Sequence, residues 1–158
     1  MPKKKILIRS ATEIGWLELV ELPELGLKRL PAKIDTGANT SAIHAENISV
    51  NAQDGADWVS FNVPDIGEDS QQPVVAKIVS RRKITNTSGV PEERIIICTT
   101  LALGGQSYEI ELSLADRGNM KYPIIIGRSA IRNRGIIVNP SRSNLNNRKI
   151  EIRRSKKA

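Results

Sequence analysis

The segment Ala32-Lys-Ile-Asp-Thr-Gly-Ala-Asn-Thr-Ser-Ala-Ile-His44 decides how this chain folds. An apolar strand runs straight into Asp35-Thr36-Gly37, which puts a carboxylate at a strand end on a tight turn. The Thr36 hydroxyl can hydrogen-bond the surrounding backbone, and Gly37 allows a second segment or a substrate to approach closely. Asp, Thr and Gly are also ordinary turn residues, so the triplet alone equally fits an Asx-type turn.

The rest of the chain shows mainly strand signals. Tyr108–Leu114 alternates apolar and polar residues over seven positions, and several short β-branched runs are bounded by Gly, Pro or Asn. Gly104-Gly105 predicts a two-residue hairpin turn. Helix signals are weak: Ser41–Asn47 could form one turn, and a short helix is expected after Gly127-Arg128. The pattern predicts an all-β protein built as a small closed β-barrel.

Composition limits the kinds of site that the chain can carry. With 158 residues it is long enough for one domain, with boundaries expected at 1–13 for a basic N-terminal segment, 14–139 for the barrel and 140–158 for a basic C-terminal segment. The single cysteine, Cys98, and the single histidine, His44, exclude an intramolecular disulfide and the usual zinc ligand sets. The chain also has no phosphate-binding loop motif for a nucleotide. We therefore expect neither a bound metal nor a cofactor. No apolar run is long enough to span a membrane, and we expect the protein to be cytoplasmic.

A second motif, Ile125-Ile126-Gly127-Arg128, follows the first by about ninety residues. Together with Asp35-Thr36-Gly37-Ala38 it resembles the retropepsin-like aspartic peptidases. The resemblance implies that Asp35 is catalytic, that Thr36, Gly37 and Ala38 support its loop, and that Ile125, Ile126, Gly127 and Arg128 pass behind that loop. It also implies a flap hairpin, for which we expect Thr85, Asn86, Thr87, Ser88, Gly89 and Val90.

A fuller match narrows the family. The strings Leu22-Pro-Glu-Leu-Gly26, Thr40-Ser-Ala-Ile-His44 and Leu114-Ala-Asp-Arg-Gly-Asn-Met-Lys-Tyr-Pro-Ile-Ile-Ile-Gly-Arg128 resemble the bacterial RimK-associated family. That family also carries the label "ATP-dependent zinc protease", and the similarity covers residues 14–139. The residues present here supply neither a zinc ligand set nor a phosphate loop, so we expect neither function.

Only one Asp-Thr-Gly triplet occurs, so one chain cannot supply the two carboxylates of acid-protease chemistry. The leading hypothesis is therefore a homodimeric aspartic endopeptidase, a hydrolase with Asp35 from both subunits. Two alternatives belong to other classes: a catalytically silent, dimeric retropepsin-like binding module, and a basic β-barrel that binds RNA or the ribosome. The expected substrate is a peptide or protein, and the family association hints at a glutamate-tailed ribosomal protein.

Several residues depart from simple expectations or have two interpretations. Asn39 stands where the retroviral enzymes carry an Asp that pairs with the arginine, so Arg128 needs another partner, for which Asp116 and Glu111 are candidates. His44 is more simply a hydrogen-bonded structural residue than a ligand, and Cys98 a buried small hydrophobe. The basic C-terminal stretch fits a solvated tail or a site for acidic protein or RNA, although no aromatic residues are interleaved for base stacking.

Overall fold

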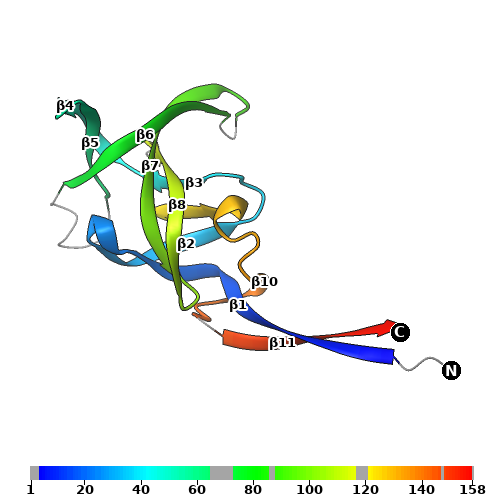
Figure 1. The fold of residues 1–158 in the computed structure, drawn as a ribbon. Helices are drawn as coiled ribbons and strands as arrows, with labels where there is room; N and C mark the ends of the chain where they lie inside the picture. The colour runs from blue at the N-terminus through cyan, green and yellow to red at the C-terminus, as the bar shows by residue number, and fades with distance from the viewer. Residues whose placement is uncertain (1–3, 65–72, 86–87, 117–120, 147, 158) are drawn as a thin grey trace.

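The computed structural model describes residues 4–64, 73–85, 88–116, 121–146 and 148–157, and nearly all of its regular structure is β (Figure 1). The strands are β1 (Lys4–Leu22), β2 (Leu27–Asp35), β3 (Ser41–His44), β4 (Glu46–Gln53), β5 (Ala56–Asn62), β6 (Val74–Thr85), β7 (Pro91–Leu103), β8 (Gln106–Ala115), β9 (Ile124–Gly127), β10 (Ile136–Ser143) and β11 (Arg148–Lys157). Two 3₁₀ helices are described, η1 (Pro23–Leu25) and η3 (Arg128–Ala130).

Six strands close into a barrel in the order β1, β2, β9, β3, β8 and β7. The ring is completed where Glu21 of β1 pairs with Ala102 of β7. β4, β5 and β6 continue from β7 as an extension of the sheet, and β10 and β11 pair with β1. The expected all-β fold with a small closed barrel is therefore confirmed.

The strand patterns explain which side chains enter the barrel. On β8, Ile110, Leu112 and Leu114 are buried, whereas Glu109 and Glu111 on either side of Ile110 are exposed; Ser113, between the two leucines, is buried as well. The alternation around Ile110 is the one that the sequence predicts, because successive side chains of a strand point to opposite faces. The rest of the core is aliphatic apart from one fully buried aromatic ring; its fully buried members include Ile14, Leu30, Ile43, Phe61, Ile97, Leu101 and Ile126.

Two local predictions have different outcomes. The Gly104-Gly105 turn between β7 and β8 is confirmed, and both glycines have positive φ, 61° and 75°, as this hairpin requires. The helical turn over Ser41–Asn47 is wrong. Ser41–His44 is a buried strand paired with β8 on one side and β9 on the other, so sheet hydrogen bonds outweigh a weak local helix preference.

The short helix expected after Gly127-Arg128 is present, but it is a single 3₁₀ turn that begins at Arg128 itself. The chain then makes turns as far as Gly135, whose φ of 66° leads into β10. No helix among the described residues is long and apolar enough to cross a membrane.

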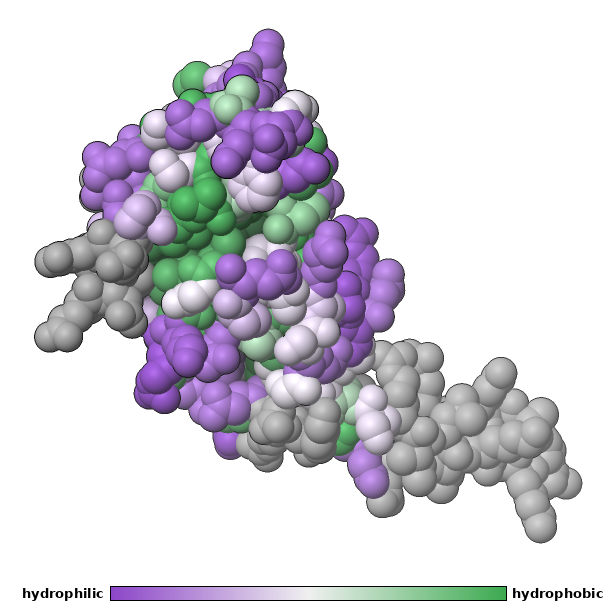
Figure 2. Space-filling model, turned by 60° about the vertical axis from the view of Figure 1, so that its left-hand side comes forward, coloured by the Kyte–Doolittle hydropathy of each residue, from purple (hydrophilic) through white to green (hydrophobic). Residues whose placement is uncertain are grey.

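The two ends of the chain run together away from the barrel (Figure 1). The first ten residues of β1 pair antiparallel with β11, from Lys4 opposite Lys157 to Glu13 opposite Arg148. On the opposite side of the barrel, β4 and β6 expose apolar side chains, namely Ile48, Val50, Val75 and Val79. Figure 2 shows a face of the molecule on which hydrophobic residues gather in one hollow, bordered by hydrophilic ones.

Candidate active site

Asp35 ends strand β2, and the next three residues form a tight turn. The Ala38 N–H donates to the Asp35 carbonyl oxygen at 3.1 Å, which closes the turn. The Gly37 N–H donates to Asp35 Oδ1, also at 3.1 Å, and so fixes the orientation of the carboxylate. A Cβ added at Gly37 would lie 3.2 Å from Asp35 Oδ1, so a side chain at this position would crowd the carboxylate. The side chain of Asp35 is left half-buried at the end of the strand.

Strand β9 lies between β2 and β3 and holds the Asp35 turn from behind. Asp35 is in parallel register with Gly127. The Gly127 N–H donates to Ser41 Oγ at 3.0 Å, and the Ser41 carbonyl accepts the hydroxyl of Ser113 at 3.2 Å. A Cβ at Gly127 would lie 2.8 Å from the Asn39 carbonyl oxygen, which is closer than real contacts allow. The glycine is thus required by close backbone packing, since its φ of −82° is ordinary.

Arg128 binds the same turn through both its backbone and its side chain. Its N–H donates to the Ala38 carbonyl at 2.8 Å, and its Nη1 donates to the Gly37 carbonyl at 3.0 Å. Neither candidate partner named from the sequence holds it: the acceptor is a backbone carbonyl, and Glu111 is paired with Arg82. Arg128 is exposed in the single chain. Its guanidinium group therefore stabilises the turn directly, with no carboxylate partner among the residues that the structure describes.

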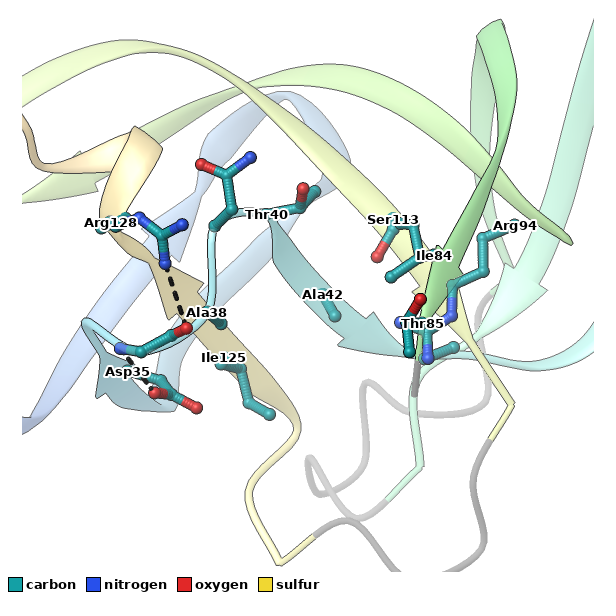
Figure 3. Close-up of a pocket in the computed structure, with 13 residues that line it drawn as sticks. Asp35, Ala38, Thr40, Ala42, Ile84, Thr85, Arg94, Ser113, Ile125 and Arg128 are labelled. Atoms are coloured by element: carbon teal, nitrogen blue, oxygen red, sulfur yellow. Dashed lines mark hydrogen bonds between the residues drawn. The ribbon is translucent and has the colours of Figure 1, made fainter. Parts of the chain in front are cut away.

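A cavity of about 410 Å³ opens over the Asp35 turn. Its floor is the turn itself, and its opposite wall comes from the β6–β7 hairpin and from β8 (Figure 3). The lining residues are Asp35, Gly37, Ala38, Asn39, Thr40, Ala42, Ile84, Thr85, Arg94, Ser113, Ala115, Ile125 and Arg128. The ionisable side chains among them are one carboxylate, Asp35, and two guanidinium groups, Arg94 and Arg128. The cavity can therefore hold a peptide-sized group beside a fixed carboxylate.

Comparison with known proteins identifies the family. A family model described as "Retropepsin-like aspartic endopeptidase RimB" matches residues 13–149. The chain belongs to this RimB-like family. The resemblance seen in the sequence is thereby confirmed, and the family description agrees with the barrel and with the Asp35 turn.

Relatives of this RimB-like chain include proteins named "Probable alpha-L-glutamate ligase". The protein from Shewanella pealeana is 38% identical over 133 residues, which are 82% of this chain and 29% of that protein. The protein from Desulfotalea psychrophila is 38% identical over 130 residues, or 81% and 28%. The chain thus spans less than a third of the length of these curated relatives. A crystal structure of a Legionella pneumophila protein of unknown function matches with a TM-score of 0.71 at 27% identity, covering 85% of this chain and 97% of that one.

The structure places the other residues predicted for the site as follows. Thr36 is exposed and lines a second cavity of about 480 Å³ together with Arg128. Ile125 faces the Asp35 cavity, and Ile126 is fully buried in the core. Thr36 and Ile126 therefore do not line the Asp35 cavity.

The predicted flap lies at the end of the β6–β7 hairpin. Thr85 ends β6 and lines the Asp35 cavity, while Ser88, Gly89 and Val90 form the turn that leads into β7. The other two predicted flap residues, Asn86 and Thr87, lie outside the described residues. A hairpin therefore stands at the mouth of the cavity, and its role as a flap stays a prediction.

His44 and Cys98 lie apart from the Asp35 cavity. His44 is buried at the end of β3, and its Nε2 lies 3.9 Å from Glu46 Oε1. Cys98 is only half-buried on β7. Burial raises the pKa of its thiol, and the carboxylates of Glu109 and Glu111 on β8 raise it further. Within the described ranges, no three His, Cys, Asp or Glu side chains group as metal ligands would.

Sequence reasoning missed two residues of the site. Ser41 caps the Gly127 N–H from within the core, and Arg94 lines the wall of the cavity opposite Asp35. Ser41 belongs to the quoted segment Ala32–His44, but only the pairing of β3 with β9 brings its hydroxyl to Gly127. Arg94 lies on β7, far along the chain from Asp35, and the fold places it on the opposite wall of the same cavity. No local pattern marks either residue, because a single Ser or Arg in a strand carries no signal by itself.

Proposed function

We propose that the protein is an aspartic endopeptidase that works as a homodimer, with Asp35 of each protomer at the two-fold axis. The observation that carries the proposal is the Asp35 turn, in which the carboxylate is fixed by the Gly37 N–H and the loop by Arg128. The cavity above the turn gives a peptide access to that carboxylate. The description of the matched family, an aspartic endopeptidase, supports the same chemistry.

The homodimer follows from the chemistry. Hydrolysis by carboxylates alone needs two of them sharing one proton, so that one acts as a base and the other as an acid. The chain contains one Asp-Thr-Gly triplet. A residue close to a two-fold axis meets its own copy, so a symmetric dimer brings the two Asp35 side chains together.

In the proposed reaction a water molecule lies between the two carboxyl groups. The ionised Asp35 takes a proton from the water as its oxygen attacks the peptide carbonyl carbon. The protonated Asp35 gives its proton to the carbonyl oxygen, which forms a neutral gem-diol. The Asp35 that took up the proton of water passes it to the amide nitrogen, and the C–N bond breaks as the other Asp35 takes a proton from a hydroxyl of the gem-diol. A carboxylic acid and an amine leave, and the two Asp35 side chains again share one proton. The Gly37 N–H keeps Oδ1 oriented throughout.

The substrate that we propose is an acidic peptide, by analogy a glutamate-tailed ribosomal protein. The chain carries a net charge of +7, which attracts acidic segments over long range. The named relatives are probable glutamate ligases, which links the family to glutamate-containing molecules. The two arginines that line the cavity, Arg94 and Arg128, agree with such a substrate.

The test compares the wild-type protein with Asp35→Asn on a diverse peptide library between about pH 3 and 8, a range that spans the ionisation of carboxyl groups. Asp57→Asn, an exposed aspartate on β5, is the matched control. Cleavage by the wild type and by Asp57→Asn, lost in Asp35→Asn while sedimentation still shows a dimer, supports the proposal. Cleavage that persists in Asp35→Asn refutes it. A wild-type dimer that cleaves no peptide refutes it too, and favours a binding module.

A further inference from the structure

Arg94 is a buried cation in the wall of the Asp35 cavity. It lies on β7 directly opposite Arg82 of β6, but the two side chains have different environments. The side chain of Arg94 is 5% exposed and that of Arg82 is 47% exposed. Burying a guanidinium group is costly unless its charge and its donors are matched by partners. The burial of Arg94 beside the cavity therefore needs an explanation.

The partner that the chain itself provides matches only part of the guanidinium group. Nε and Nη2 of Arg94 both donate to a single oxygen, Glu92 Oε2, at 3.3 and 3.2 Å. The carboxylate of Glu92 is 44% exposed, so much of its charge is solvated. A guanidinium group has five N–H donors in a planar fork. Among the residues that the structure describes, none accepts a hydrogen bond from Nη1.

The surroundings make this cation able to bind an anion. The cavity that Arg94 lines is partly apolar, since Ile84, Ala42 and Ala115 line it too. Figure 3 shows Arg94 on the side of the cavity opposite Asp35. A charge-assisted hydrogen bond is stronger where water is partly excluded.

We infer that Arg94 is the specificity-determining residue of this cavity and holds a carboxylate of the bound peptide. The inference rests on the proposed function, because it assigns the peptide to the same cavity as Asp35. The free edge of the guanidinium group binds the substrate carboxylate while Glu92 keeps Nε and Nη2. The carboxylate belongs to an acidic side chain or to a C-terminus, since both present the same two oxygens to the fork.

The experiment measures peptide binding to the Asp35→Asn protein, so that affinity is read without turnover. Three short peptides are compared: one with a central Glu and an amidated end, one with Gln in that place, and the Gln peptide with a free C-terminus. Arg94→Gln is introduced into this background, and Arg82→Gln is the matched control, since it removes the same charge from the same hairpin outside the cavity. Salt concentration is held constant, because long-range attraction depends on it.

We expect Arg94→Gln to weaken binding of one of the two peptides that carry a carboxylate, either the Glu peptide or the Gln peptide with a free C-terminus. The expected loss is about tenfold to a hundredfold, the range for a hydrogen bond to a charged group. Binding of the amidated Gln peptide should be unchanged, and Arg82→Gln should bind all three like the parent. Loss with the Glu peptide identifies a side-chain carboxylate, and loss with the free C-terminus identifies a terminal one. An unchanged preference in Arg94→Gln, or an equal loss in Arg82→Gln, overturns the inference.

A second variant decides the matter if Arg94→Gln does not fold. Glu92→Gln alters a partly exposed side chain and removes a negative charge that repels a substrate carboxylate nearby, while its amide oxygen can still accept from Nε and Nη2. It should strengthen binding of the carboxylate peptide, and an unchanged or weaker affinity overturns the inference. If the wild-type protein cleaves no peptide, the proposed function fails, whereas these binding measurements still decide the role of Arg94.

Discussion

Replacing Glu18 by alanine should destabilise the protein strongly, although Glu18 does not line the Asp35 cavity. Glu18 lies on β1 and is completely buried. Its carboxylate accepts three backbone N–H groups: Gly15 at 2.7 Å, Leu145 at 2.9 Å and Asn146 at 2.8 Å. It therefore ties the segment between β10 and β11 to the barrel. Alanine removes every one of these acceptors.

The three donors have different exposure, and this sets the size of the effect. The Gly15 bond is fully buried, and an unpaired buried donor costs about 1–3 kcal/mol. The hydrogen bonds from Leu145 and Asn146 are only partly buried, so water can replace the lost acceptor. Removing each of these bonds therefore costs about 0.5–1.5 kcal/mol of stability. Removing a buried charge returns some desolvation energy. We therefore expect a loss of about 2–4 kcal/mol in the free energy of unfolding.

Urea unfolding at neutral pH, followed by circular dichroism, measures this loss directly. At about 2–4 °C per kcal/mol for a protein of this size, the melting temperature should fall by roughly 4–16 °C. Glu21→Ala, an exposed position on the same strand, is the control and should change stability little. Glu18→Gln keeps one acceptor oxygen, so its free energy of unfolding should lie between those of Glu18→Ala and Glu21→Ala. If Glu18→Ala is within about 0.5 kcal/mol of Glu21→Ala, a surface-like change, the carboxylate does not hold this segment.

Two further predictions concern Gly127 and Cys98. Gly127→Ala should cost about 1–3 kcal/mol in thermal unfolding, because its Cβ would lie 2.8 Å from backbone atoms of Asn39 and Thr40; a melting curve like that of the wild type would contradict this packing. Iodoacetamide should alkylate Cys98 slowly at neutral pH, because burial first, and Glu109 and Glu111 next, raise its pKa and so reduce the reactive thiolate. Glu109→Gln lowers that pKa and should speed the reaction, and equal rates for the two proteins would exclude the carboxylate effect.

Local sequence was sufficient for the features that depend on neighbouring residues. Asp35-Thr36-Gly37 predicted a carboxylate on a turn after a strand, and Gly104-Gly105 predicted a hairpin. The alternation in Tyr108–Leu114 predicted which face of β8 is buried. Each of these follows from backbone freedom or from the period of a strand, and both are properties of a short segment.

Tertiary structure decided the features that depend on segments far apart in the chain. Leu17 and Leu19 flank Glu18, so local hydrophobicity alone would put the leucines inside; instead Glu18 is fully buried and Leu19 is 37% exposed. Arg94 likewise lies in a β-strand whose sequence gives no sign that its side chain lines the same cavity as Asp35. The segment Ser41–His44 became a strand because β8 and β9 pair with both of its edges. In each case the deciding neighbours lie far along the chain, and only the tertiary fold brings them together.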